Sequence, residues 1–207
     1  MELTRAVQRR KMVRSFTGEP VPPEQLEHML ALACTAPSAG NTGGWDAVVL
    51  TGADTALFWE ATTTSQWRAR SRRWAGLARA AAVVAAFVDP DAYVARYGAD
   101  DKQGSGLGKG VESWTVPYWY VDGGFALLLM LLAATDVGLG ACLLGNFRGE
   151  EALRSALGVP AGRRYVGAVA LGPPDDDDSP STSLERGRRA PAVIVHRGRW
   201  DAGRHPG

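Results

Sequence analysis

Residues 122–135 read Asp122-Gly-Gly-Phe-Ala-Leu-Leu-Leu-Met-Leu-Leu-Ala-Ala-Thr135, and this run decides the fold. As a helix it is apolar on nearly every side, so most of its surface has to be buried. In a chain of 207 residues, such a helix lies at the centre of the domain or at an interface between subunits. We therefore expect a central or interfacial helix here.

Short apolar runs on both sides of this helix predict the strands of a sheet. The predicted strands are 47–51, 81–88, 141–145, 165–171 and 192–196. Helices are predicted at 3–12, from Pro20 to a point before Pro37, irregularly at 54–76, and at 149–157. Residues 98–116 contain five glycines, which predicts a mobile excursion or lid.

The composition is that of a soluble globular protein, with 45% hydrophobic and 22% charged residues. A formal net charge of +1 argues against a nucleic-acid partner and against membrane-surface binding, because both need a broad basic field. The longest apolar stretch, 125–134, is shorter than the about 20 residues that span a bilayer. The first residues are polar and basic, unlike a signal peptide, so we expect a cytoplasmic protein.

Cys34 and Cys142 both lie within apolar runs. Their ordinary interpretation is as free, buried thiols of a reducing compartment. No histidine is near either cysteine in the sequence, so no metal site is expected, and no Gly-x-Ser-x-Gly motif occurs. If the chain is an enzyme, we expect a cofactor to supply the reactive group.

A basic string, residues 9–16, reads Arg-Arg-Lys-Met-Val-Arg-Ser-Phe. Arg10 and Arg14 are four residues apart, so on a helix they share one face, and guanidinium groups bind phosphate oxygens in pairs. A second arginine cluster at 186–189 precedes the last predicted strand, and a third lies at 68–73. The string is either an anion site or the solvated end of a helix.

Two further segments are candidates for a ligand site. In the loop Pro37-Ser-Ala-Gly-Asn41, small residues allow a close approach to the backbone, and Ser38 and Asn41 offer polar groups to a ligand ring. In Leu143-Leu-Gly145, apolar side chains could cover the face of a planar ring. An ordinary turn and a plain strand end explain these segments equally well.

Taken in order along the chain, these segments resemble the nitroreductase family of FMN-dependent oxidoreductases. The resemblance covers most of the chain, and its specificity lies in the ordered set. The set comprises Arg14-Ser-Phe16, Pro20-Val-Pro22, residues 36–41 followed by Trp45, Asp122 with its helix, Gly138-Leu-Gly140, Leu143-Leu-Gly145, Leu157-Gly-Val-Pro160, Ala170-Leu-Gly-Pro173 and Val195-His-Arg-Gly-Arg-Trp200.

The resemblance implies an α+β fold in which helices flank a central, mainly antiparallel sheet. It also implies an intertwined homodimer with FMN at the subunit interface. Residues 1–172 would form the nitroreductase-like FMN-binding domain, 173–190 a polar linker, and 191–207 a C-terminal arm whose strand completes the sheet of the partner. Four successive aspartates at 175–178 independently favour a linker after the last strand of the domain.

The family's binding residues can be carried over by position. Those implied to hold the phosphate and ribityl parts of FMN are Arg10, Lys11, Met12 (through its backbone), Arg14, Arg188 and Arg189. Those implied to approach the flavin ring from the partner subunit are Pro37, Ser38, Ala39 and Asn41. Those implied to line the other side of the ring are Leu143, Leu144 and Gly145, whose backbone lies near the redox-active edge. The flavin is the reactive group, so no side chain is assigned as catalytic, and no metal is implied.

Members of the family take a hydride from NADH or NADPH onto the flavin and reduce acceptors such as nitroaromatics or quinones. The resemblance therefore implies a small, flat aromatic acceptor. Two other interpretations stay open: the same fold with other flavin chemistry (flavin fragmentation, dehalogenation or desaturation), and a flavin-binding module without catalysis.

This chain departs from the family's pattern in three places. Residues 42–44 read Thr-Gly-Gly where many members have Gln-Pro, which loosens the loop, and Met12 replaces a commonly polar residue. The aromatic residues of 114–120 and the excursion at 98–116 are not general family features. We expect them to shape the acceptor pocket, with side chains from Trp114, Tyr118, Trp119 and Tyr120.

Overall fold

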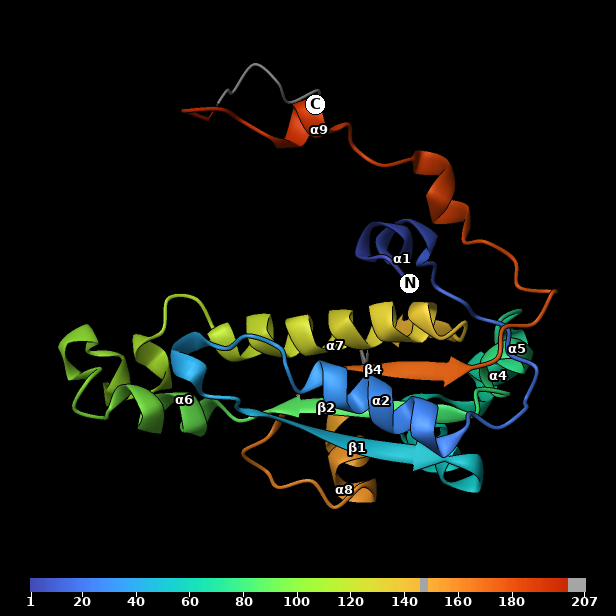
Figure 1. The fold of residues 1–207 in the computed structure, drawn as a ribbon. Coiled ribbons are helices and arrows are strands. Elements are labelled where there is room, and N and C mark those ends of the chain that lie inside the picture. Colours follow the sequence, from blue (N-terminus) through green and yellow to red (C-terminus); the bar gives the residue numbers. More distant parts are fainter. Residues whose placement is uncertain (146–148, 201–207) are drawn as a thin grey trace.

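The computed structural model describes residues 1–145 and 149–200 and has an α+β fold (Figure 1). Its four-stranded sheet has the order β1-β2-β4-β3, and every neighbouring pair is antiparallel. The strands are β1 Trp45–Thr51, β2 Ala82–Val88, β3 Gly140–Leu144 and β4 Arg164–Gly172. The antiparallel sheet and the positions of these strands are confirmed.

The sheet separates two hydrophobic layers. All seven residues of β2 are buried, as expected for a middle strand that is covered on both faces. Its side chains alternate, because Val83 and Phe87 point into one core cluster, whereas Ala82 and Val84 point into the other. Each face of the sheet is therefore packed against its own set of helices.

The apolar helix is α7, Tyr118–Asp136, which lies along one face of the sheet beside α2, Pro23–Ala33 (Figure 1). Met29 of α2 and Met130 of α7 are buried in the same cluster as β2 and β4. A Cβ added at Gly123 would lie 2.9 Å from Val88 Cγ1, so the helix approaches the sheet closely where it lacks a side chain. The expected central helix is confirmed.

Helix α7 is longer than the apolar stretch at 125–134 suggested. Within the described part of the chain, it is the one helix whose 19 residues and apolar composition would allow it to cross a membrane. The prediction that the apolar stretch at 125–134 is too short to span a bilayer concerned that stretch alone, and the helix continues beyond it at both ends. About half of the helix is buried within the chain, as in a core helix. Val121, Phe125 and Leu128 remain exposed.

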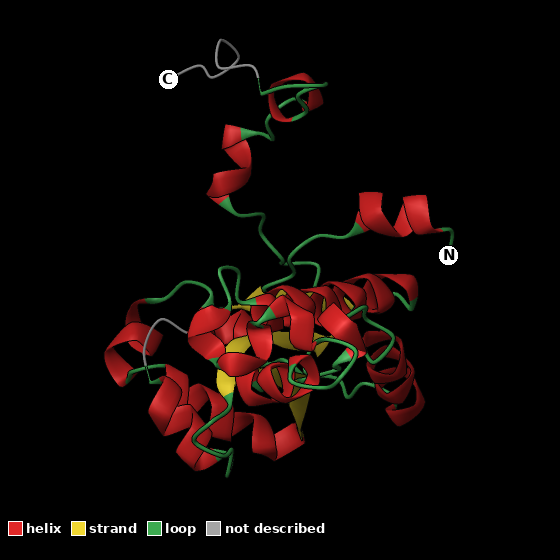
Figure 2. Ribbon diagram, turned by 90° about the vertical axis from the view of Figure 1, so that its left-hand side faces the viewer, coloured by secondary structure: helices red, strands yellow, loops and turns green. Residues whose placement is uncertain are grey.

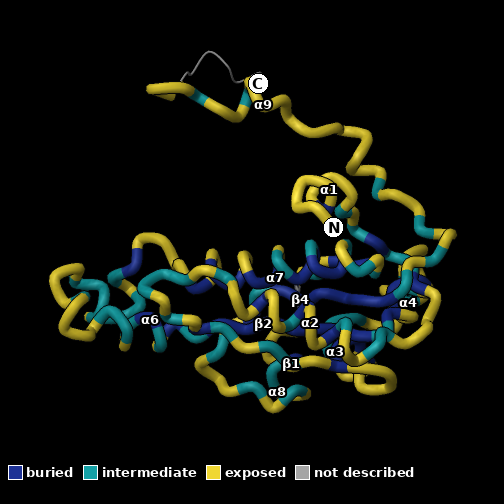
Figure 3. Tube along the Cα trace, in the orientation of Figure 1, coloured by how far each residue is buried: buried dark blue, intermediate teal, exposed yellow. Residues whose placement is uncertain are grey.

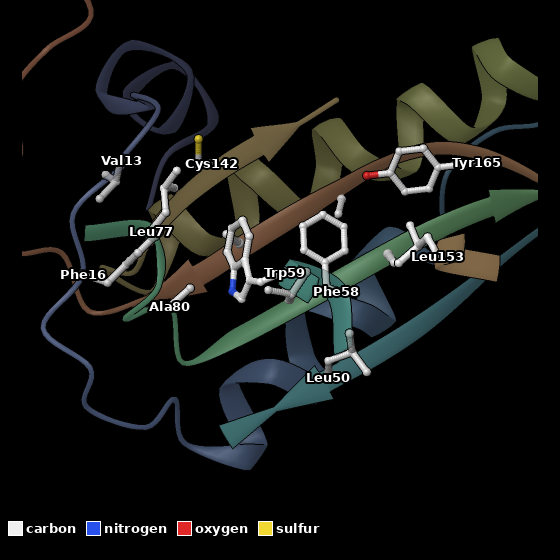
Figure 4. Packing of buried hydrophobic residues seen from close by; sticks show 14 of the residues in the cluster. Val13, Phe16, Leu50, Phe58, Trp59, Leu77, Ala80, Cys142, Leu153 and Tyr165 are labelled. Carbon is white, nitrogen blue, oxygen red and sulfur yellow. The ribbon is translucent and has the colours of Figure 1, made fainter. Parts of the chain in front are cut away.

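Short helices cover the other face of the sheet. They are α3 Thr55–Thr62, α4 Ser65–Arg70, α5 Trp74–Leu77 and α8 Glu150–Ala156. Phe58 and Trp59 of α3 lie with Leu153 of α8 and Tyr165 of β4 in the cluster over this face (Figure 4). The irregular helical region expected at 54–76 is thus three short helices.

Strand β2 leads into α6, Pro90–Tyr97, at one end of the sheet. Residues 98–116 then form three single turns: η3 Gln103–Ser105, η4 Leu107–Lys109 and η5 Val111–Ser113. Leu107 and Val111 pack against a buried aromatic cluster of Tyr93, Trp114 and Trp119. The expected excursion is therefore folded against α6.

The two ends of the chain lie outside the sheet. Helix α1, Leu3–Arg9, ends earlier than the predicted 12. Residues 173–181 still contact the body through Asp175 and Asp178, and the chain beyond them extends away from it (Figures 1 and 2) with most of its residues exposed (Figure 3). The extension carries η6 Thr182–Arg186 and α9 Pro191–Ile194.

The strand predicted at 192–196 is wrong for the single chain. Pro191 opens the turn of α9, a position where the missing N–H of proline costs nothing. None of the described strands has its ladder partner in this segment, so no sheet edge among the described residues holds it extended. Residues 201–207 of the predicted arm lie outside the described residues, and exchange of the arm between subunits stays a prediction.

The two cysteines differ in burial. Cys142 of β3 is buried, but Cys34 is exposed. The buried face of α2 runs through Leu26, Met29 and Ala33, and Cys34 follows one position later, about 100° around the helix. The prediction of two buried thiols is therefore right for Cys142 and wrong for Cys34.

Leu153→Ala should lower the free energy of unfolding by about 2–5 kcal/mol, because it empties a fully buried position between α8 and α3. Leu57→Ala, on the exposed side of α3, is the matched control and should cost less than about 1 kcal/mol. Urea unfolding followed by circular dichroism measures both losses. Equal losses would contradict the placement of α8 on the core.

Candidate functional site

The basic string lies against the outer edge of β3. Met12 forms a bridge with Ala141, and the Val13 N–H donates to the Ala141 carbonyl at 2.9 Å. The Leu143 N–H lies 3.4 Å from Met12 Sδ, so the methionine that replaces a polar residue contacts the backbone of β3. The structure thus brings two predicted site segments together, the basic string and residues 143–145.

A carboxylate occupies the basic string in the single chain. Asp178 Oδ1 accepts from the backbone N–H groups of Arg14 at 2.7 Å and Ser15 at 3.2 Å, and Lys11 Nζ lies 3.6 Å from Oδ2. The Asp178 side chain is only 5% exposed. We call these donors of Arg14, Ser15 and Lys11 the anion cradle, because they already stabilise a negatively charged oxygen in place of a ligand anion.

Two arginines that the sequence did not assign to the site lie beside the cradle. Arg79 donates to Ser15 Oγ at 3.1 Å and to Asp175 at 2.6 Å, and Arg73 donates to Ser181 Oγ at 3.3 Å. They add positive charge around the basic string. The arginine cluster at 68–73 was the only sequence signal for Arg73, and nothing in the sequence pointed to Arg79.

Helix α5 fixes the backbone of the string from one side. A Cβ added at Gly76 would lie 2.5 Å from the Arg14 carbonyl oxygen, and the Phe16 N–H donates to the Gly76 carbonyl at 3.4 Å. Phe16 itself is fully buried. The string is therefore held between α5 and β3.

The predicted phosphate residues are only partly assembled. Arg10 and Arg14 lie on the basic string, where Arg14 Nη1 donates to the Met12 carbonyl at 3.1 Å. Arg188 and Arg189 belong to the extended C-terminal segment (Figures 1 and 2), where Arg189 donates to the Val193 carbonyl at 3.3 Å.

The end of β3 is fixed by a buried tyrosine. The Tyr165 hydroxyl donates to the Leu144 carbonyl at 3.2 Å, and its N–H donates to Glu150 at 3.3 Å. Burial, followed by the Glu150 charge, raises the pKa of Tyr165 above its ordinary value. Gly145, which follows Leu144, is exposed, and residues 146–148 lie outside the described residues.

The loop of residues 37–41 lies at the opposite end of α7. The Ala39 N–H donates to Asp122 Oδ2 at 2.8 Å, and the Gly43 N–H donates to Ser38 Oγ at 2.8 Å. Asn41 is exposed and has φ 54°, the one positive φ among the non-glycine residues described. Such a conformation is uncommon outside glycine and marks a constrained position.

Asp122 joins this loop to α6. It is 3% exposed, and the Tyr93 hydroxyl donates to the same Oδ2 at 2.8 Å. Burial, and then the hydrogen bond to Asp122, raises the pKa of Tyr93 well above its ordinary value.

The two halves of the predicted site are far apart in one chain. The loop is anchored near the first turn of α7, and the basic string is anchored to β3, which starts four residues after α7 ends. A helix of 19 residues is roughly 28 Å long. In Figure 1 the loop accordingly lies near α6, whereas the string lies near α1 and α5 at the other end.

The aromatic residues predicted to form an acceptor pocket divide into two kinds. Trp114 and Trp119 are buried with Tyr93, and the Trp114 indole donates to the Leu107 carbonyl at 3.0 Å. Tyr118 and Tyr120 are exposed on the first turn of α7. The tryptophans therefore pack the fold, and the tyrosines are the members that a ligand can reach.

Within residues 1–145 and 149–200, no three His, Cys, Asp or Glu side chains come together as metal ligands would.

Comparison with known proteins places this geometry in a family. The sequence profile of the Nitroreductase family matches residues 7–173. An Archaeoglobus fulgidus protein provisionally named NADH dehydrogenase/NAD(P)H nitroreductase is 27% identical over 203 residues, which cover 96% of this chain and 99% of that protein.

Solved structures show the same fold. A nitroreductase family protein of Clostridium difficile superposes with a TM-score of 0.71 at 18% identity, over 97% of this chain and 100% of that chain. A protein of Desulfovibrio desulfuricans, provisionally named a nitroreductase and solved in complex with FMN, superposes with a TM-score of 0.68 at 23% identity, over 97% and 99% of the two chains.

The raised pKa values of Tyr93 and Tyr165 predict how the protein responds to alkali. Because the folded state favours the neutral hydroxyls, their contribution to stability is complete below the unfolded pKa of about 10 and is lost as the pH rises above it. We expect neither tyrosine to ionise at about pH 11 unless the protein unfolds.

Near-ultraviolet absorbance of tyrosinate, compared between the protein and its Tyr93→Phe and Tyr165→Phe variants, isolates the two signals. Ionisation of either tyrosine near its ordinary pKa, with the circular dichroism of the folded protein intact, would contradict the burial and bonding described above.

Proposed function

The chain belongs to the nitroreductase family of FMN- and NAD(P)H-dependent oxidoreductases, and we propose that it reduces a small, flat acceptor, of the nitroaromatic or quinone type, with electrons from NADH or NADPH. One observation carries the proposal: the basic string and the end of β3 converge on a cradle that already binds an anion. Bound FMN supplies the hydride-accepting and electron-donating chemistry, and the chain positions and polarises it.

The anion cradle fits the phosphate end of FMN. A phosphate oxygen would take the place of the Asp178 carboxylate on the Arg14 and Ser15 amides, beside Lys11. Arg10 and Arg14 would add guanidinium donors, which suit phosphate geometry. In this proposal Arg188 and Arg189 join them only when the C-terminal segment packs against the sheet and helices of its own subunit or of the partner subunit.

The end of β3 would lie beside the flavin ring. Leu143 is 40% exposed and offers an apolar surface next to Met12, while Tyr165 holds the Leu144 carbonyl in place. The exposed Gly145 leaves its backbone accessible. A Gly145 N–H next to this fixed carbonyl would be a preorganised donor for the negative charge of a reduced flavin.

A second copy of the chain would complete the site. Tyr118, Val121, Phe125 and Leu128 are exposed on α7 at spacings that place them along one side of the helix. If two α7 helices pack antiparallel about a two-fold axis, the first turn of one lies beside the last turn of the other. This arrangement would bring the partner's 37–41 loop to the basic string.

The colour of the purified protein tests the flavin assignment. We expect a yellow protein whose visible absorbance bleaches when NADH or NADPH is added without oxygen. Arg14→Gln should weaken FMN binding about tenfold or more, because it removes a charge-assisted donor, whereas Arg164→Gln, at an exposed position of β4, should not. A protein that takes up no FMN would overturn the proposal, and flavin that neither nucleotide bleaches would favour a binding module or other flavin chemistry.

The oligomeric state tests the shared site. Leu128→Asp places a charge on the exposed apolar face of α7 and should yield a monomer that has lost most of its FMN. Leu57→Asp makes the same change on α3, where the leucine is similarly exposed, and should leave both properties unchanged. Light scattering coupled to size-exclusion chromatography gives the mass, and absorbance gives the FMN content. A Leu128→Asp dimer with full FMN content would contradict this interface.

A further inference from the structure

The 37–41 loop forms one short turn, in which the Asn41 N–H donates to the Ser38 carbonyl at 2.9 Å and the Thr42 N–H donates to the Ala39 carbonyl at 3.2 Å. The turn depends on backbone conformations that few residues other than glycine adopt. Gly40 and Gly43 have φ of 63° and 60°, and Asn41 has φ 54°. Glycines in such conformations have many alternatives in a free chain, so their order has an entropic cost. The Thr-Gly-Gly at 42–44 adds to this freedom, so contacts from other elements lower the cost of keeping the loop in this conformation.

Helix α6 binds the loop through Arg96. Its Nε donates to the Gly40 carbonyl at 2.8 Å, while Nη1 and Nη2 each donate at 2.8 Å to a different carboxylate oxygen of Asp101. The two-point pairing sets the plane of the guanidinium and aims Nε at the loop. Asp101 belongs to the 98–116 segment, so this segment orients the group that holds Gly40.

Hydrogen bonds from Arg96 lower the pKa of Asp101 to about 2. Both groups therefore stay charged from mildly acidic to alkaline pH. The pair is open to solvent, so salt screens its electrostatic attraction. What matters for the loop is the direction that the pair gives to Arg96 Nε.

Aromatic side chains of α6 explain two of the loop's glycines. A Cβ at Gly40 would lie 2.8 Å from Tyr97 Cε2, and a Cβ at Gly44 would lie 2.6 Å from Tyr93 Cε2. Trp114, from the end of the 98–116 segment, packs edge-on against Tyr97 with ring centroids 4.8 Å apart. Gly40 and Gly44 are thus positions where a ring of α6 leaves no room for a side chain, whereas a Cβ at Gly43 would meet nothing within 4 Å.

Asp122 holds the loop from the other side. It accepts from the Ala39 N–H and from the Tyr93 hydroxyl, so α6, α7 and the loop meet at one buried carboxylate. The Ala39 N–H and the Gly40 carbonyl are both used in this way. Within the described chain, the Asn41 side chain makes no such bond and stays exposed for a ligand.

We propose that α6 and residues 98–116 form a bracket that presets the 37–41 loop for the flavin ring, with Arg96 and Asp122 as positioning residues. The inference rests on the proposed function, because the loop is expected to meet the ring of FMN. The bracket takes over the support that a Gln-Pro loop would supply from its own sequence. A loop that is ordered before binding pays less entropy when the ligand arrives.

Hydrogen exchange of the protein without flavin tests the bracket itself. Arg96→Lys keeps the charge but cannot pair with Asp101 at two points and also reach Gly40, so amides of residues 38–44 should exchange about tenfold faster. Asp101→Asn, at an exposed position, should give a smaller increase and is the variant least able to disturb folding. Arg164→Lys is the matched control and should leave the loop unchanged. Unchanged exchange in both Arg96→Lys and Asp101→Asn would overturn the bracket.

The same variants then test its role in binding. Arg96→Lys should raise the Kd for FMN about tenfold and shift the visible spectrum of the bound flavin, which a purely structural loss distant from the ring would not do. Faster loop exchange with an unchanged Kd and spectrum would overturn the link to the flavin. If the wild-type protein binds no FMN, the proposed function and this link both fail, while the exchange result still decides whether the bracket exists.

Discussion

The structure depends on one constraint: α7 is apolar around almost its whole circumference, and a single chain covers only part of it. One side is buried against β2, β4 and α2, with Gly123 allowing close contact. Another side leaves Phe125 and Leu128 exposed. The helix also spaces the functional segments, because Asp122 near its first turn anchors the 37–41 loop, whereas the basic string lies beyond its last turn. In the dimer that we propose, the same second copy of the chain would cover α7 and unite the two segments.

The sequence predicted the sheet well because its strands are continuous apolar runs, which burial on both faces requires. Through the family resemblance, the sequence also predicted that the basic string and residues 143–145 belong to one site. The bridge between Met12 and Ala141 agrees with that prediction. It could not predict the conformation of 192–196. An apolar run of that length becomes a strand only where a sheet edge accepts it, and among the described residues Pro191–Ile194 is a helical turn outside the four-stranded sheet.

Long-range polar contacts were also beyond the sequence. Arg96, Asp101 and Tyr93 carry no motif, and their roles follow from meeting Gly40, Gly44 and Asp122 in three dimensions. Asp178 is the clearest case. Within a run of four aspartates it reads as part of a hydrated linker, yet its carboxylate is nearly buried on the anion cradle. If the proposed phosphate binds there, it would compete with this carboxylate for the same donors, and the route of the linker would depend on the occupancy of the site.

In the dimer that we propose, each flavin site combines the basic string of one subunit with the 37–41 loop of the other. Co-expression of two differently tagged chains, one carrying Arg14→Glu and one carrying Ser38→Glu, tests it most directly. Each parent dimer has a defect in both of its sites, but a hybrid dimer would have both defects in one site and none in the other. Isolated by both tags, the hybrid should recover half of the wild-type FMN content. A hybrid as empty as its parents would place the whole site within one chain and contradict the account.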